Sequence, residues 1–246
     1  MHNIAVPTIF AIDTAGERCC LVLTRGAEVH TLLGEPQLAH LEQVMPMIDR
    51  LFANAHLRPE DCDAFGFGSG PGSFTGLRVA CTIVQGLALA TNRPVIAVGN
   101  LLLLAAAAHK GGLRPPAAGA RSRILAAIDA RMQQAYWAVY DYSGGAWSEA
   151  VPPSLCEATS LQEAVSVWQP TGCAGNAAWL QRHVGQAPST RLCDVAVESA
   201  VLAQMVQEKF FRGELIAPEQ ALPAYVLDRV ALTVSERRAS TLGARS

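Results

Sequence analysis

Apolar and polar positions alternate along the first half of the chain in a pattern that predicts strands and helices in turn. Three short apolar runs with tight turns between them predict antiparallel strands at 8–12, 19–24 and 28–33. From Leu38 to Phe52 the apolar residues recur in steps of three and four, which predicts an amphipathic helix containing Pro46. The same reasoning predicts the next four elements: a strand at 64–67, a helix at 77–91, a strand at 94–98 and a helix at 101–108.

The second half repeats this mixture after a segment rich in glycine and proline at 109–121, which we interpret as a linker. Beyond it the pattern predicts strands at 123–128, 135–141, 147–151, 171–174 and 190–193, and helices at 159–168, 176–183 and 199–212. We therefore expect a first domain at 1–108, completed by 213–230, a second domain at 122–212, and a flexible tail at 231–246.

The two halves also share a short motif. Asp13 follows an apolar strand and precedes a returning strand, and Asp129 has the same setting. Two strand–Asp-turn–strand units suggest a duplicated α/β architecture. Two matches can also arise by chance, so the motif alone leaves the duplication open.

Composition narrows the class of protein. Half of the 246 residues are hydrophobic, so a core is available and a disordered chain is excluded. With 19 basic and 21 acidic residues the overall field does not attract nucleic acid, which leaves only a local patch. The seven cysteines lack C-x-x-C spacing and the histidines lack ligand spacing, so we expect reduced thiols and no metal. Neither a secretory signal nor a bilayer-length apolar run is evident, so we expect a cytoplasmic protein without membrane contact.

The strongest local feature is the glycine-rich loop at 68–76, which follows a predicted strand and opens a helix. Free N–H groups there can hold an anion, with Thr75 as the expected N-cap. The loop lacks the lysine ending of a P-loop, so a tight structural turn and a protein contact remain open. Asp13 and Asp129 could likewise hold magnesium or water near phosphates, or simply make Asx-turns.

The helix at 77–91 is apolar nearly all round, which predicts burial on every side. It is either the central helix of its domain or is covered partly by another subunit. One of its stripes runs through Leu77, Cys81, Val84 and Ala88, and the other through Ala80, Ile83, Leu87 and Ala90. The sequence does not say which of the two stripes points outward.

Three segments together resemble the TsaB family, formerly called YeaZ: the loop from Gly70 to Arg78, the segment Ile128–Met132 and the opening Ile12-Asp13-Thr14. The resemblance extends over nearly the whole chain. It implies a duplicated actin-like ATPase (ASKHA) fold of class α/β, with two domains flanking a cleft. It also implies a part in forming threonylcarbamoyladenosine beside the tRNA anticodon.

The related TsaD transferases carry an H-x-x-x-H metal pair that opens a helix after a strand. By order of elements, Asn100 and Leu104 stand at those two positions. Leucine cannot ligate a metal, so the resemblance implies a non-catalytic dimerisation and scaffold subunit. Its implied partners are a TsaD-like transferase and a TsaE-like ATPase, with a homodimer when TsaD is absent and tRNA reached only through the complex.

Two sets of site residues follow from these arguments. The nucleotide or anion candidates are Asp13, Thr14, Gly70, Gly72, Ser73, Thr75 and Asp129. The partner-interface candidates are Leu41, Met45, Ile48, Leu77, Ala80, Ile83, Val84 and Leu87. No cofactor is expected to be required, with weak ATP or ADP binding left open. The rival functions are an autonomous ATPase or small-molecule kinase on the same fold and, more remotely, a peptidase.

Overall fold

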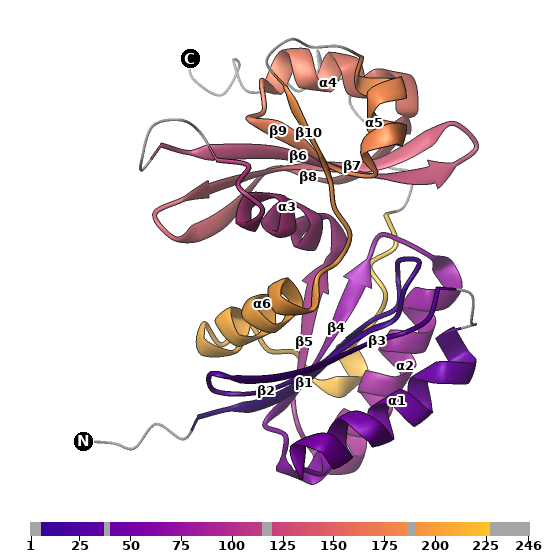
Figure 1. Cartoon of the computed structure of the whole chain (residues 1–246), viewed down its shortest axis with the longest axis vertical. Helices are drawn as coiled ribbons and strands as arrows, with labels where there is room; N and C mark the ends of the chain where they lie inside the picture. Colours follow the sequence, from indigo (N-terminus) through magenta and orange to yellow (C-terminus); the bar gives the residue numbers. More distant parts are fainter. Residues whose placement is uncertain (1–5, 37–39, 115–119, 186–189, 227–246) are drawn as a thin grey trace. The chain divides into compact units, whose positions relative to one another are not determined.

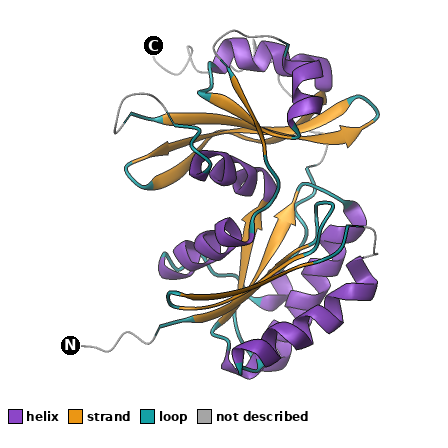
Figure 2. Ribbon diagram, in the orientation of Figure 1, coloured by secondary structure: helices purple, strands orange, loops and turns teal. Residues whose placement is uncertain are grey.

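The computed structural model describes residues 6–36, 40–114, 120–185 and 190–226, which form two compact units. The first unit takes the described residues up to Leu103 together with Val197–Tyr225. The second takes those from Leu104 to Ala196. Each unit is a five-stranded sheet covered by helices, so the fold is α/β (Figure 2).

The sheet of the first unit has the order β3-β2-β1-β4-β5. Its strands are β1 (Thr8–Asp13), β2 (Cys20–Arg25), β3 (Glu28–Leu33), β4 (Ala64–Gly70) and β5 (Val95–Gly99). The first three form an antiparallel meander, whereas β4 runs parallel to both β1 and β5. The three predicted strands at the start of the chain are thus confirmed, and β4 extends three residues further than expected, into the glycine-rich loop.

Helices cover both faces of this sheet, with α1 (His40–Ala55) and α2 (Phe74–Thr91) on one side and α6 (Ser199–Phe211) on the other (Figure 1). A 3₁₀ turn, η1 (Pro59–Asp61), lies between α1 and β4. Side chains alternate along β1, so Phe10 and Ile12 join the core under α1 and α2. On the opposite face Gly66 lies against Val206 of α6, where an added Cβ would come within 2.7 Å of that side chain.

The position of α6 corrects the expected domain boundary. The sequence pattern assigned 199–212 to the second domain, but α6 packs on β1, β2 and β5 of the first. Its apolar residues Val201, Leu202, Met205 and Val206 are buried there. The two units therefore divide near Leu103 and Val197 rather than at the predicted linker and residue 212.

A C-terminal strap, residues 216–225, completes the first unit. Ile216 forms a β-bridge with Val95 of β5, and the short 3₁₀ turn η3 (Pro218–Gln220) follows. The backbone oxygen of Ala221 then accepts a hydrogen bond from the Cys81 thiol, at 3.1 Å, and Ala224 N donates to Ser69 O at 2.7 Å. The strap therefore packs along one side of α2.

The second sheet has the order β10-β9-β6-β7-β8. Its strands are β6 (Ser122–Arg131), β7 (Gln134–Ser143), β8 (Ala146–Glu157), β9 (Gly172–Gly175) and β10 (Arg191–Asp194). Here too an antiparallel meander is extended by two parallel strands, in the same chain order as in the first unit. The duplication suggested by Asp13 and Asp129 is thereby confirmed at the level of topology.

One face of this second sheet carries α4 (Leu161–Trp168), preceded by η2 (Ala158–Ser160), and α5 (Ala177–Val184). The second half of α3 (Asn100–Lys110) lies on its other face (Figure 1). The predicted linker at 109–121 begins inside α3 and includes Leu113, which is fully buried and whose oxygen accepts a bond from Ser122 Oγ. Residues 115–119 of that linker and the predicted tail at 231–246 lie outside the described residues.

Candidate functional site

The carboxyl ends of β1, β4 and β5 bring three distant segments to one edge of the first sheet. Asp13 ends β1, Gly70 ends β4, and Asn100 follows β5 at the start of α3. The side-chain nitrogen of Asn100 donates to Asp13 Oδ2 at 2.5 Å, and its side-chain oxygen accepts from Gly70 N at 2.7 Å. Ligands of open α/β sheets bind outside such carboxyl ends, so the predicted nucleotide residues lie where a ligand would be expected.

Asp13 itself is enclosed by its neighbours. It is 1% exposed, as is Asn100. A Cβ on Gly68 would overlap the Asp13 carboxylate, so only glycine fits beside it. The other carboxylate oxygen accepts a bond from Ala15 N at 3.3 Å, which is the Asx-turn alternative considered from the sequence. The geometry gives Asp13 a structural part in joining β1, β4 and α3.

The glycine-rich loop packs directly against the turn that follows Asp13. Ser73 N donates to Ala15 O at 2.9 Å, and Thr14 Oγ1 donates to Gly76 O at 2.6 Å. A Cβ on Gly76 would overlap the backbone oxygen of Thr14. Thr14 is fully buried by these contacts. The glycines of this loop therefore permit a close approach of two backbones, which is the tight-turn interpretation.

The expected N-cap at Thr75 is wrong. Helix α2 begins at Phe74, and Ser73 caps it by accepting a bond from Gly76 N at 3.3 Å. Both residues carry a hydroxyl, but Ser73 is held in the cap position by its bond to Ala15. Thr75 lies in the first turn of α2 and is exposed.

The remaining candidate, Asp129, belongs to the second unit, so the described contacts do not unite it with Asp13. It accepts a bond from Arg131 N at 2.8 Å, which again forms an Asx-type turn. Residues Arg131, Met132 and Gln133 all adopt positive φ angles in this β6–β7 hairpin. Of the seven nucleotide candidates, five are joined at the first sheet through contacts with Ala15, Gly76 and Asn100: Asp13, Thr14, Gly70, Gly72 and Ser73.

Asn100 and Leu104 stand at the positions where the resemblance places a metal pair in TsaD transferases. Asn100 is bonded on both sides into the sheet, and Leu104 is a buried aliphatic side chain, 6% exposed, without a donor atom. This pair does not fit a metal. Asn100 is the first residue of α3, and its amide reaches across to β1 and β4.

Burial separates the predicted interface residues into two groups. Leu41 and Met45 are 70% and 50% exposed on α1, and Ile83 and Leu87 are half-buried on α2. The other four predicted interface residues lie inside the core of the first unit and cannot form a surface, so their assignment to the partner interface is wrong: Ile48, Leu77, Ala80 and Val84.

Neither predicted stripe of α2 points outward. The Leu77 stripe faces the sheet, while Ile83 and Leu87 pack at the flank of the same core. The opposite flank is occupied by the strap, where Gln85 Nε2 donates to Pro218 O at 3.0 Å. From Cys81 to the end of α2 the exposed positions are Thr82, Gly86, Leu89 and Ala90. We call these four, together with Leu41 and Met45, the helical outer face; the sequence argument missed Leu89, which is 52% exposed.

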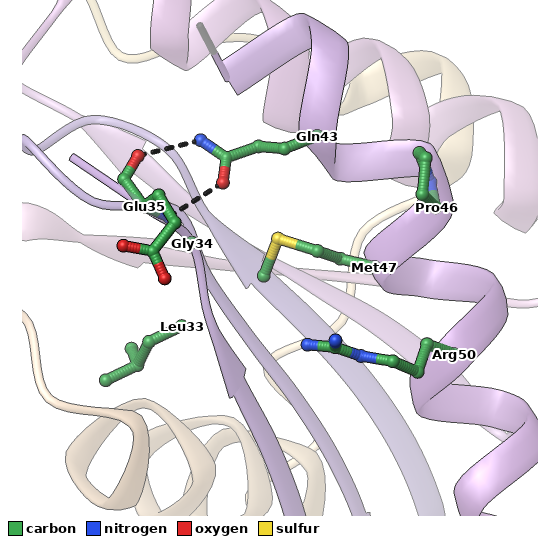
Figure 3. Close-up of a pocket in the computed structure, with 7 residues that line it drawn as sticks. All are labelled: Leu33, Gly34, Glu35, Gln43, Pro46, Met47 and Arg50. Atoms are coloured by element: carbon green, nitrogen blue, oxygen red, sulfur yellow. Dashed lines mark hydrogen bonds between the residues drawn. The ribbon is translucent and has the colours of Figure 1, made fainter. Parts of the chain in front are cut away.

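A pocket of about 320 Å³ lies beside α1, where the chain leaves β3 (Figure 3). It is lined by Leu33, Gly34, Glu35, Gln43, Pro46, Met47 and Arg50. Gln43 accepts from Glu35 N at 2.8 Å and donates to Glu35 O at 3.1 Å, which fixes the chain at the mouth of the pocket. The pocket belongs to neither predicted set of site residues.

The arrangement of possible metal ligands and the length of the apolar helices bear on the expectations about metal and membrane. Within that part of the chain no group of three or more His, Cys, Asp or Glu side chains is placed to hold a metal ion. Helix α2 is long and apolar enough to cross a membrane by composition, with 39% of its length buried; core helices of soluble proteins meet the same criterion.

Comparisons with known proteins agree on one family. Residues 35–238 match the family described as "TsaD: tRNA N6-adenosine threonylcarbamoyltransferase". A protein of Escherichia coli (strain K12) called "tRNA threonylcarbamoyladenosine biosynthesis protein TsaB" is 33% identical over 231 residues, covering 91% of this chain and 96% of that protein. A Haemophilus influenzae protein of the same name is 30% identical, with 91% and 94% coverage.

A solved structure and a transferase extend the comparison. The crystal structure of a Pseudomonas aeruginosa protein "with similarity to peptidase YEAZ" superposes with a TM-score of 0.76 at 31% identity, covering 89% of this chain and 99% of that one. A "tRNA N6-adenosine threonylcarbamoyltransferase" of Thermus thermophilus is 34% identical over 118 residues, which is 45% of this chain and 36% of that protein.

Proposed function

The chain belongs to the TsaB family and has its actin-like (ASKHA) fold, and on that premise we propose that it takes part in forming threonylcarbamoyladenosine in tRNA. In this proposal it is a non-catalytic subunit that supports a TsaD-like transferase. A TsaE-like ATPase joins the assembly, tRNA is modified within it, and the assembly works in the cytoplasm.

The observation that carries the non-catalytic role is the bonding of Asn100. At the position where the resemblance places a metal-ligating histidine, the Asn100 amide is hydrogen-bonded to Asp13 and Gly70. Four residues later, the Leu104 side chain has no atom that can bind a metal. A leucine cannot replace an imidazole as a ligand, so the transfer chemistry must be supplied by the partner.

The supporting role rests on the helical outer face. Leu41, Met45 and Leu89 expose large apolar side chains on the two helices of one sheet face. Gly86 and Ala90 are exposed near Leu89 on α2, and small residues allow a partner helix to approach closely. We propose that the TsaD-like subunit covers this face, and that a second copy of this chain covers it when that subunit is absent.

The rival function, an autonomous ATPase or kinase, requires Asp13 to reach a nucleotide. The enclosure of Asp13 by Gly68, Asn100 and Ala15 weighs against that part, although weak ATP or ADP binding at the N-terminus of α2 is compatible with the exposed loop. We propose that no cofactor is required by this chain alone.

Reconstitution tests the proposal. The full chain is combined with a TsaD-like and a TsaE-like protein from the same organism, ATP, tRNA and an activated threonylcarbamoyl donor, and the threonylcarbamoyladenosine formed in tRNA is measured by mass spectrometry. We expect activity that needs this chain, together with co-elution of this chain and the TsaD-like protein. Full modification without the chain, or ATP turnover by the chain alone that Asp13→Ala abolishes, would overturn the proposal and favour the rival.

A further inference from the structure

The basic residues of the second unit gather at one edge of its sheet. β6, β9 and β10 are parallel, so their amino ends share an edge, and β7 ends and β8 begins at the same edge. Arg191 opens β10 there, Arg121 and Arg123 flank the first residue of β6, and Lys110 and Arg114 lie at the end of α3. Arg191 Nη1 donates to Gly112 O at 3.4 Å, which joins the end of α3 to β10. We call these five residues the basic edge.

Three of the six described acidic residues of this unit lie at the other edge. Asp129 ends the regular part of β6, Glu157 pairs with Gln134 at the far end of β7, and Asp194 ends β10. Near the basic edge Asp141 is shared between Arg123, at 2.8 Å, and Arg121, at 3.5 Å. One carboxylate therefore contacts two guanidinium groups. The other acidic residue near this edge is Glu149 of β8, which pairs with Tyr140, the neighbour of Asp141 in the sequence. Unit two is polarised along its strands although the whole chain is nearly neutral.

Helix dipoles account for only part of this polarity. Lys110 lies in the last turn of α3, where a cation offsets the negative end of the helix. Arg114, Arg121 and Arg191 lie outside helices and are exposed. Their accumulation needs another explanation, and a polyanion is the partner that such a set of exposed cations fits.

Aromatic rings stand beside these cations. His109, Tyr142 and Trp147 pack against one another with ring centroids 4.2, 4.9 and 5.6 Å apart, and all three are partly exposed. Burial and the charge of Arg114 lower the pKa of His109, so its ring stays neutral near pH 7. Partly exposed aromatic rings next to arginines are the means by which proteins hold unpaired RNA bases and the adjoining phosphates.

We propose that the basic edge, with the adjoining aromatic rings, binds RNA directly through its phosphate backbone and an unpaired base. The identification of this RNA as tRNA rests on the proposed function. The inference that this edge binds RNA rests on the placement of the charges and rings alone. An anionic membrane fits less well, because the exposed large apolar side chains found in the described residues, such as Met132 in this unit, lie elsewhere than at this edge. Direct contact would let this subunit bind the RNA substrate in addition to binding the transferase.

The test measures binding of the full chain to tRNA from the same organism by fluorescence anisotropy, between about 50 and 200 mM salt. The edge variant Lys110→Gln with Arg114→Gln removes two exposed cations whose side chains make no described bond. We expect its Kd to rise on the order of tenfold and the slope of log K against log salt to flatten by about 2. The control variant, Arg25→Gln with Arg58→Gln, removes two exposed cations from the first unit and should bind as the unchanged chain does.

Two further arms separate the alternatives. Trp147→Leu should weaken binding to tRNA more than binding to a polyphosphate of equal charge, because only the former stacks a base. Vesicles containing anionic lipid should not compete. The inference is overturned by the absence of tRNA binding at 50 mM salt, by equal losses in edge and control variants, or by preferential vesicle binding. If the edge variant still co-elutes with the TsaD-like protein, failure of the RNA-binding inference is distinguished from failure of the proposed function. The two are separable because the proposed interface with the TsaD-like protein lies on the first unit.

Discussion

Asn100 donates a hydrogen bond of 2.5 Å to the carboxylate of Asp13, which lies 87 positions earlier in the chain. The pair ties the end of the central strand to the start of the helix that leads into the second unit. Both residues are 1% exposed, so water cannot replace either partner. The resemblance to TsaD transferases places a metal ligand at the position of Asn100, which here makes a structural hydrogen bond.

Removing either member of this pair should cost stability. We expect Asp13→Ala and Asn100→Ala each to lower the free energy of unfolding by about 3 kcal/mol, because each leaves a buried polar group without its partner. The double variant should cost clearly less than the sum, since the interaction can be lost only once. Urea denaturation measures all three; simple additivity would contradict the interpretation. Asp129→Ala, at an exposed turn, is the control and should cost less than about 1 kcal/mol.

Two glycines of α2 provide a matched pair for the glycine-rich loop. Gly76→Ala should destabilise the chain by more than about 2 kcal/mol, because the new Cβ overlaps the backbone oxygen of Thr14. Gly86 has no atom within 4 Å of such a Cβ, so Gly86→Ala should stabilise the isolated chain by about 0.5–1 kcal/mol. Thermal melts compare the two variants. Equal effects would show that Gly76 is not held by backbone contact.

The helical outer face gives a prediction for Leu89, which lies three residues after Gly86 on α2. Leu89→Glu should keep the melting temperature within a few degrees and abolish co-elution with the TsaD-like subunit, because its side chain is half exposed. Val84→Glu, on the same helix but fully buried, should unfold the first unit. Phe211→Glu, 65% exposed on α6 across the sheet, is the control and should alter neither property. A Leu89→Glu chain that still co-elutes would exclude this face as the interface.

The buried cysteines predict a loss of stability in alkali. Burial raises the pKa of Cys19, Cys20, Cys62 and Cys173 from 9.0 to about 12 each. Below pH 9 these thiols are protonated in both states. Between about pH 9 and 12 the unfolded chain releases protons that the folded chain retains, so rising pH favours unfolding.

Each of these thiols should contribute a loss of about 1.4 kcal/mol per pH unit within that window. Urea denaturation at steps from pH 7 to 10.5 measures the slope, which Cys62→Ala should make shallower by one group's share. Iodoacetamide at pH 8 should label none of these four rapidly in the folded chain and all of them in urea. A flat profile above pH 9 would contradict the burial of these side chains.

The sequence predicted the strands and helices well because their apolar periods are local. The meander of β1, β2 and β3 and the helical steps of α1 need no knowledge of distant residues. What depended on long-range contact was missed. The amide of Asn100 bonds across the sheet, and α6, predicted as part of the second domain, packs on the first.

The same limit explains the errors at the candidate sites. α2 is almost uniformly apolar, so its period cannot show which side faces out; the strap arriving at Gln85 and Cys81 decides it. Ser73 and Thr75 are equally suitable caps by composition, and the bond from Ser73 N to Ala15 O selects the former. The basic edge is likewise invisible in a net charge, because acids at the opposite strand ends cancel it.

The strap and α6 also set an order of events during synthesis on the ribosome. The described residues that build the second sheet and its helices lie between Leu104 and Ala196, whereas the first unit needs residues as late as Tyr225. Domains fold as units once their residues have emerged. The amino-terminal sheet must therefore wait, with the α6 face of β1 and β5 uncovered, until nearly the whole chain has left the exit tunnel. The half that is made first therefore depends on residues that are made after Ala196.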